Sequence, residues 1–154
     1  MSDTPSIHAS AVLVGARAVL IRGPSASGKS SFVLALLQAA QSGIFPFARL
    51  VADDRAYVSA AHGRLIVRPA ETLKSMVEVR GLGILRIPYE PAAVVGSVVD
   101  LDVADAQRLP DKTACETVIA GVRLARLAVA PGADPLGLYR TFLSQQDLSG
   151  RKEA

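Results

Sequence analysis

A glycine-rich run in the first fifth of the chain has the residue types that bind phosphate groups. It matches the pattern G-x-x-x-x-G-K-[ST] at every fixed position. Glycines let backbone N–H groups turn inward around a phosphate chain, and a helix starting near the lysine adds the positive end of its dipole. A glycine turn with a surface lysine would make no use of the final serine. The predicted nucleotide-binding residues are Gly23, Pro24, Ser25, Ala26, Ser27, Gly28, Lys29 and Ser30.

The last two residues of this run have separate expected roles. Lys29 is expected to reach the β- and γ-phosphates of a nucleoside triphosphate as a point charge. The hydroxyl of Ser30 is expected to bind Mg²⁺.

Two consecutive carboxylates, Asp53 and Asp54, follow the apolar run 50–52. A phosphate loop needs an acid from another strand to hold Mg²⁺ or its water. Neighbouring residues on a strand face opposite ways, so one carboxylate is expected to face the loop and the other a different partner, such as Arg55 or a backbone N–H. The spacing does not choose between them, and both could instead open the following turn.

Three other residues are candidates for the same site. Glu78 and Arg80 are two apart in an extended run and are expected to share a face, which would place a metal-binding carboxylate beside a phosphate-binding guanidinium. A solvated strand face with a weak ion pair would give the same pattern. His8 is expected on the first strand, near the loop, where it is either catalytic or structural.

The elements that must position these residues are mostly strands. Residues 7–14 and 17–21 are expected to pair antiparallel, and residues 29–41 have helical periodicity. Asp134 and Pro135 are typical of the start of a helix, here over 134–146. Further strands are expected at 48–53, 56–61, 64–68, 77–80, 84–87, 92–101 and, bent at Gly121, within 117–130. The predicted class is α/β, a P-loop-containing mixed sheet with few helices.

Composition narrows the function classes. The chain has 154 residues, half of them hydrophobic, which fits one domain over residues 1–154, with fraying expected at 1–5 and 150–154. The net charge of +3 is dispersed and tryptophan is absent, so a nucleic-acid partner is not expected. No apolar stretch is long enough to span a bilayer, and we expect a cytoplasmic protein without membrane contact.

Four segments, in this order, resemble the catalytic domain of HPr kinase/phosphorylase. They are residues 7–9 (Ile-His-Ala), the loop 23–30, residues 49–55 (Arg-Leu-Val-Ala-Asp-Asp-Arg) and residues 77–84 (Val-Glu-Val-Arg-Gly-Leu-Gly-Ile). The resemblance covers about residues 6–130. It implies an ATP- and Mg²⁺-dependent kinase for a serine of HPr, the small carrier of the phosphotransferase system. It also implies a fold related to phosphoenolpyruvate carboxykinase and a homo-oligomer, such as a hexamer.

The resemblance also assigns roles to residues. The catalytic residues would be Asp53 as the base, His8 as its support, Lys29 and Arg80. The expected metal ligands are Ser30, Glu78 and Asp54.

The resemblance implies a short form without the N-terminal domain of the longer relatives, and two further departures bear on function. Ser31 stands where they have an acidic residue, and residues 130–134 replace a basic, Asn-containing segment. Removal of phosphate from phosphoserine needs cations for a second phosphate, so we expect this activity to be weak or absent unless Arg123, Arg126 or Arg140 substitutes. A nucleotide sensor without transfer and a small-molecule kinase are the alternatives.

Overall fold

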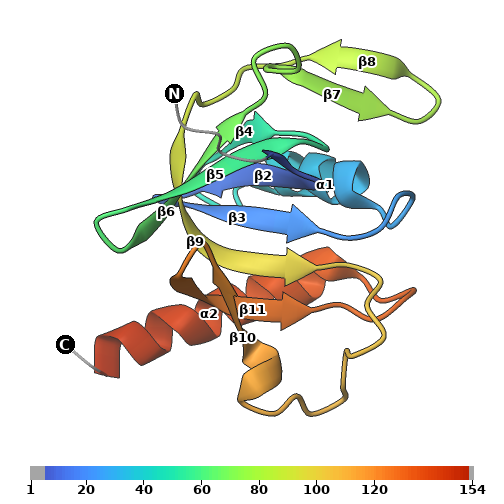
Figure 1. Cartoon of the computed structure of the whole chain (residues 1–154). Coiled ribbons are helices and arrows are strands. Elements are labelled where there is room, and N and C mark those ends of the chain that lie inside the picture. Colours follow the sequence, from blue (N-terminus) through green and yellow to red (C-terminus); the bar gives the residue numbers. More distant parts are fainter. Residues whose placement is uncertain (1–5, 153–154) are drawn as a thin grey trace.

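The structure is a computed structural model that describes residues 6–152, with side chains described up to residue 146. Strands dominate the part of the chain that it describes (Figure 1). In chain order the elements are β1 (Ser6–Ile7), β2 (Ala9–Val14), β3 (Arg17–Arg22), α1 (Lys29–Gln41), β4 (Ala48–Ala52), β5 (Ala56–Ala61), β6 (Arg64–Pro69), β7 (Met76–Val79), β8 (Gly83–Arg86), β9 (Ala93–Asp100), the 3₁₀ helix η1 (Thr113–Cys115), β10 (Glu116–Ile119), β11 (Val122–Ala128) and α2 (Pro135–Lys152).

One long strand, β9, joins the two halves of a mixed sheet. Its first residues pair antiparallel with β6, with Val94 opposite Ile66. Its later residues run parallel to both β3 and β11. The path through the sheet is β1-β5-β6-β9-β3-β2-β4, and β10 and β11 extend it from β9. The predicted α/β class with a mixed sheet and few helices is confirmed.

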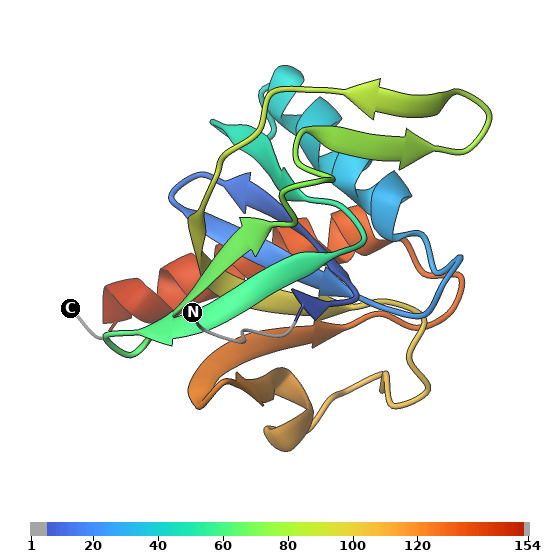
Figure 2. The same ribbon diagram turned by 45° about the horizontal axis from the view of Figure 1, so that its top comes forward.

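The period-two pattern of β3 separates two cores. Ala18 and Leu20 belong to a buried cluster shared with β5 and β6, whereas Val19 and Ile21 belong to a cluster shared with α1 and α2. Successive side chains on a strand point to opposite faces, so β3 can contact both layers. The β7–β8 hairpin forms a separate two-stranded sheet beside α1 (Figure 2), and its Val77 enters the helix-side core.

The two helices begin where the sequence predicts. Helix α1 follows Gly28, whose φ of 97° is left-handed, and its buried residues recur at helical spacing: Phe32, Val33, Leu36 and Ala39. Asp134 accepts a hydrogen bond from the N–H of Leu136 at the start of α2. Tyr139 of α2 packs edge-on against Phe32, with ring centroids 5.9 Å apart. The carboxyl end of β3, where the loop begins, therefore packs against both helices through the helix-side core.

Several predicted boundaries are wrong. His8 lies in a bend between β1 and β2, because β1 pairs with β5 while β2 pairs with β3 and β4. Arg80 lies in the turn after β7 and does not continue the strand of Glu78. Helix α2 extends to Lys152, which includes residues 150–152 that were expected to fray. The other predicted frayed residues, 1–5 and 153–154, lie outside the described part.

Within residues 6–152, no helix is both long enough and apolar enough to cross a lipid bilayer.

Candidate active site

The phosphate loop connects β3 to α1 and is closed by its own lysine. Lys29 is only 6% exposed. Its Nζ donates to the carbonyl oxygens of Gly23 at 2.9 Å and Pro24 at 3.2 Å. A Cβ on Gly23 would stand 2.5 Å from the Ser27 hydroxyl oxygen, so only glycine fits this close approach. In the free chain the loop is therefore held closed by its own buried ammonium.

Asp53 is the carboxylate that faces this loop. It is 7% exposed, and the hydroxyl of Ser30 is 3.0 Å from each of its oxygens. The hydroxyl of Ser10 donates to its Oδ1 at 2.8 Å, and the backbone N–H of Glu78 is 3.3 Å from its Oδ2. The carboxylate thus joins β2, α1 and β7 at one point.

The Ser30 hydroxyl and the Asp53 carboxylate fit a magnesium ion. Both supply oxygen atoms, the ligands that Mg²⁺ prefers. Among the described residues, no group of three or more His, Cys, Asp or Glu side chains could hold a metal alone. Mg²⁺ is commonly bound by one or two protein oxygens together with water and substrate phosphates, so a two-residue contribution fits a metal that arrives with a nucleotide.

Asp54 turns away from the loop and pairs with His8. Its Oδ1 lies 2.5 Å from the Nε2 of His8, and the two side chains are 65% and 47% exposed. Both residues sit where the chain passes from one half of the sheet to the other: His8 between β1 and β2, and Asp54 between β4 and β5. Asp54 has a φ of 67°, a left-handed conformation that aspartate tolerates. The opposite orientations of Asp53 and Asp54 match the expectation from the sequence.

Ser10 is a residue of this site that the sequence reasoning missed. It is fully buried on β2, donates to Asp53, and accepts a hydrogen bond from the N–H of Asp54 at 3.0 Å. One hydroxyl therefore holds the carboxylate of Asp53 and the backbone of Asp54. The available signal was a lone serine between Ala9 and Ala11 in an apolar strand, where a buried hydroxyl needs a partner.

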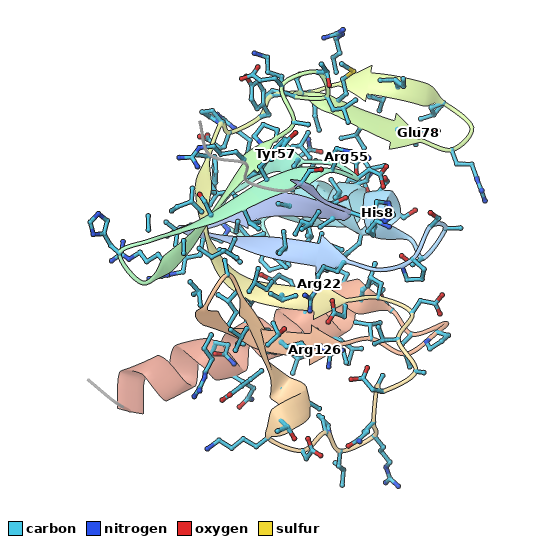
Figure 3. All side chains as sticks on the ribbon, in the orientation of Figure 1. His8, Arg22, Arg55, Tyr57, Glu78 and Arg126 are labelled. Carbon is cyan, nitrogen blue, oxygen red and sulfur yellow. The ribbon has the colours of Figure 1, made fainter. Side chains whose placement is uncertain are left out.

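Among the described residues, the side chains of Glu78 and Arg80 make no polar contact with the other residues of the candidate site. Figure 3 shows Glu78 on the β7–β8 hairpin above His8. The side chains of Glu78 and Arg80 are both exposed, and within the described residues neither makes a hydrogen bond or ion pair to the site. Only the backbone of Glu78 reaches Asp53. The structure thus brings together Lys29, Ser30 and Asp53, places the His8–Asp54 pair beside them, and leaves Arg80 in a solvated turn.

A buried ion cluster supports the entry to the loop. Arg22, the residue before Gly23, donates to both oxygens of Asp100 at 2.7 and 2.8 Å, and Arg126 donates to Asp100 at 2.5 Å. Burial alone would raise the pKa of Asp100, but the hydrogen bonds and charges of the two arginines outweigh it and lower the pKa. The cluster joins β3, β9 and β11 at the ends from which the loops leave.

Arg126 is fully engaged in this cluster. It also donates to both carboxylate oxygens of Asp105, at 3.0 and 3.1 Å, and to the carbonyl oxygen of Ala114 at 3.1 Å. Its guanidinium is therefore not free to supply a cation beside residues 130–134. Arg123 lies 3.8 Å from Glu116, on the β10–β11 hairpin.

Comparison with known proteins finds sequence relatives of one family. Residues 1–93 match the family model described as the HPr Serine kinase C-terminal domain. The HPr kinase/phosphorylase of Streptococcus sanguinis strain SK36 is 32% identical over 140 residues, which are 84% of this chain and 43% of that protein. The HPr kinase/phosphorylase of Streptococcus thermophilus strain LMD-9 is 38% identical over 88 residues, 56% of this chain and 26% of that protein. The chain thus spans less than half the length of these relatives.

A solved structure shows the same fold. The HPr(Ser) kinase/phosphatase from Coxiella burnetii superposes with a TM-score of 0.77 at 20% identity, over 97% of this chain and 94% of that chain. The fold likeness and the sequence matches lead to one conclusion: the chain belongs to the HPr serine kinase C-terminal domain family.

Proposed function

We propose that this chain is an ATP-dependent protein serine kinase whose substrate is an HPr-like phosphocarrier. The observation that carries the proposal is an exposed His8–Asp54 pair beside the phosphate loop, in which Ser30 is bonded to the buried Asp53. An exposed proton acceptor next to a phosphate site suits a hydroxyl presented by another protein. The family and its named relatives support the same reaction.

In this proposal the loop side of the site binds ATP and Mg²⁺. Lys29 shifts from the loop carbonyls to the phosphates, where its charge offsets the charge that develops during transfer. Ser30 and Asp53 hold Mg²⁺, which supplies charge compensation on the phosphate oxygens when it is bound. Glu78 is a further candidate for the metal side, since its backbone already lies against Asp53.

We assign proton transfer to Asp54 and metal binding to Asp53. This assignment reverses the roles that the resemblance suggested for the two carboxylates. Asp53 already accepts hydrogen bonds from the Ser30 and Ser10 hydroxyls and from the N–H of Glu78. A carboxylate whose lone pairs are already occupied by hydrogen bonds leaves no oxygen free to receive the substrate proton. Asp54 is exposed, and His8 engages only its Oδ1.

The step can be written with these atoms. The Oδ2 of Asp54 accepts the proton of the substrate serine while the serine oxygen bonds to the γ-phosphorus. The bond from that phosphorus to the oxygen bridging the β-phosphate breaks, and ADP leaves. His8 acts as a positioning residue that orients Asp54. Arg80 contacts the γ-phosphate only in the bound state, since its turn is solvated in the free chain.

The reverse reaction is proposed to be weak. The segment 130–134 contributes no cation to the loop side of the site, and Arg126 is held by Asp100 and Asp105. A second phosphate would therefore meet little charge compensation.

We also propose that the chain works in the cytoplasm and assembles into a homo-oligomer. Leu109 and Val118, 83% and 60% exposed, provide apolar surface that assembly would bury. A sedimentation experiment that finds only a monomer with full transfer activity would contradict the assembly.

The transfer itself is tested by incubating the chain with γ-labelled ATP, Mg²⁺ and HPr, followed by mass spectrometry of HPr. We expect label on a serine of HPr, and none with Lys29→Ala, in which the phosphates lose their lysine. Exposed Lys74, on the loop before β7, provides the matched control Lys74→Ala, which should transfer normally. Nucleotide binding without transfer would instead favour a sensor.

A further inference from the structure

The β5–β6 hairpin and the residue before it carry positive charge with no acidic residue among them. Residues 55–70 contain three arginines, Arg55, Arg64 and Arg68, and no aspartate or glutamate. All three arginine side chains are exposed. Within residues 6–146 none of the three belongs to an ion pair. Their charges are therefore available to a partner.

Strand alternation places these charges on one face of the hairpin. Val58, Leu65 and Val67 belong to a buried cluster, so the residues between them face outward. In the register of the hairpin, Tyr57 lies opposite Arg68 and Ala61 lies opposite Arg64. Arg64 and Arg68 are four residues apart on β6, which is roughly 13 Å along the strand. We call the outward surface formed by Arg55, Tyr57, Arg64 and Arg68 the arginine face.

One end of the arginine face adjoins the proposed proton acceptor. Arg55 follows Asp54 directly in the chain, and its guanidinium donates to the hydroxyl of Ser6 at 3.1 Å. Ser6 is opposite Tyr57 in the pairing of β1 with β5, and β1 leads into His8. Figure 3 shows Arg55 close to His8. A stable protein contact covers roughly 800 Å² of each partner, so a protein that presents a serine to Asp54 also covers this end of the arginine face.

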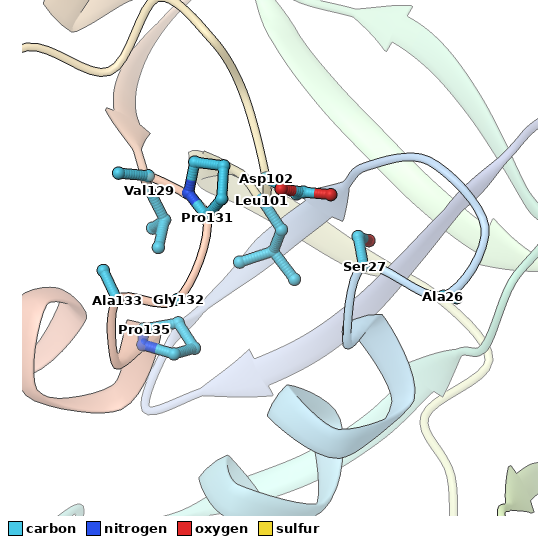
Figure 4. Close-up of a pocket in the computed structure, with 10 residues that line it drawn as sticks. Ala26, Ser27, Leu101, Asp102, Val129, Pro131, Gly132, Ala133 and Pro135 are labelled. Atoms are coloured by element: carbon cyan, nitrogen blue, oxygen red, sulfur yellow. The ribbon is translucent and has the colours of Figure 1, made fainter.

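The loops that follow β3, β9 and β11 have different charge. They line the pocket drawn in Figure 4, which contains one carboxylate, Asp102, and no lysine or arginine. A negatively charged protein surface is repelled by a carboxylate and attracted by unpaired guanidinium groups. Such a surface is therefore directed toward β5 and β6 and away from these loops.

We propose that the arginine face is the docking surface for the protein substrate, and that it recognises carboxylates on the substrate around the accepting serine. The inference rests on the proposed kinase function and adds the chemistry by which the substrate is selected. Arginine and tyrosine are enriched at protein interfaces. Tyr57 is 38% exposed and lies between Arg55 and Arg68, so it supplies a rigid contact area among the charges.

Charge reversal on β6 tests the docking surface through the KM for HPr. Exposed charges at an interface act mainly on the rate of encounter, so Arg64→Glu and Arg68→Glu should each raise this KM roughly three- to tenfold. The kcat and the KM for ATP should stay within about twofold, because these arginines lie outside the reacting groups. Arg68→Lys keeps the charge and should restore the KM. Arg123, an exposed strand arginine on the β10–β11 hairpin, provides the matched control Arg123→Glu.

Salt provides a second measurement on the same proteins. Raising NaCl from about 50 to 300 mM screens exposed charges, so the KM of the wild type for HPr should rise. The double variant Arg64→Glu/Arg68→Glu should show a weaker rise or none. A purely structural role for the two arginines would not produce this difference.

Zero-length coupling identifies the carboxylates of the partner. In Arg68→Lys the introduced amine can attack a carboxylate of HPr that a carbodiimide has activated, which forms an amide and releases the urea. Mass spectrometry should find peptides of HPr linked at position 68 through aspartate or glutamate. Arg123→Lys, treated in the same way, should give no such link.

The outcomes separate the docking surface from the proposed function. Normal transfer to HPr with an unchanged KM in both charge-reversed variants would overturn the docking surface alone. If the variants instead lose binding to an oligonucleotide, or change the sedimentation of the chain, while the KM for HPr stays the same, the arginine face serves nucleic acid or a second copy and the proposal is wrong. A wild-type chain that transfers nothing to HPr would overturn the proposed function and, with it, this docking surface.

Discussion

Replacing Ser10 with alanine should weaken both the fold and the site, because one buried hydroxyl bonds to the carboxylate of Asp53 and to the backbone of Asp54. The variant removes a 2.8 Å hydrogen bond to the carboxylate of Asp53 and a 3.0 Å hydrogen bond from the backbone of Asp54. Ser97 is the matched control. It is also buried on a strand, at 4% exposure, but among the described residues its hydroxyl makes only a 3.4 Å contact with the hydroxyl of Tyr139.

The expected magnitude follows from these contacts. A hydrogen bond to a charged group contributes roughly 1.5–3 kcal/mol, and a neutral one about 1 kcal/mol. Ser10→Ala should therefore lower the free energy of unfolding by about 3 kcal/mol, and Ser97→Ala by about 1 kcal/mol or less. In a domain of this length, 3 kcal/mol corresponds to a fall in Tm of roughly 6–12 °C.

Urea denaturation at pH 7 measures the loss, and circular dichroism confirms that both variants are folded. Phosphoryl transfer is the second measurement. Ser10→Ala should slow transfer at least roughly tenfold, because a misplaced carboxylate loses orientation, while Ser97→Ala should not. If Ser10→Ala destabilises the chain no more than Ser97→Ala does, the reasoning that one hydroxyl holds the Asp53 carboxylate and the Asp54 backbone is refuted.

Three other perturbations have defined outcomes. Arg126→Met should lower the free energy of unfolding by roughly 2–4 kcal/mol at pH 7, since it leaves the buried Asp100 with one arginine. The pKa of Asp100 is lowered in the folded chain, so its ionised carboxylate stabilises the fold above the unfolded pKa, and this stabilisation is lost as the pH falls through the folded pKa. In urea titrations the free energies of unfolding of wild type and Arg126→Met should therefore converge at acid pH. Burial raises the pKa of Tyr139 to about 12. The neutral phenol therefore stabilises the fold fully below pH 10, and this stabilisation is lost as the pH rises toward 12. The free energy of unfolding of the wild type should fall by about 2 kcal/mol between pH 10 and pH 12, and that of Tyr139→Phe should not. Phosphoserine-HPr with millimolar phosphate and Mg²⁺ should release pyrophosphate far more slowly than the forward reaction runs, and comparable rates would show that the segment 130–134 is not the determinant.

Local patterns account for the parts of the site that the sequence predicted. The loop 23–28 and the helix Lys29–Gln41 agree with the expected bounds, because both depend on residues that are neighbours in the chain. The pairing of β2 with β3 likewise follows from two apolar runs with a short turn between them. Strand alternation also predicted that Asp53 and Asp54 would point in opposite directions; they do, but both lie in the bend after β4, and Asp54 has a left-handed φ of 67°.

Non-local pairing accounts for what was missed. The apolar strand pattern continues from Ile7 through Ala9, yet His8 lies in a bend between two strands. The bend arises because β1 pairs with β5 whereas β2 pairs with β3. Which carboxylate faces Ser30 depends on how β4 lies against β2, which no spacing within residues 50–54 reveals. The cluster around Asp100 joins residues 78 and 26 positions away, so it becomes visible only once β9 is placed between β3 and β11.

The proposal that Asp54 accepts the proton and Asp53 binds the metal is tested most directly by comparing Asp54→Asn with Asp53→Asn. The measurement is single-turnover transfer from MgATP to HPr. We predict that Asp54→Asn binds MgATP like wild type but transfers roughly 100-fold or more slowly, since only the proton acceptor is lost. Asp53→Asn should instead require a higher Mg²⁺ concentration for nucleotide binding, because its carboxylate holds the metal side with Ser30. Transfer by Asp54→Asn at the wild-type rate would contradict the account.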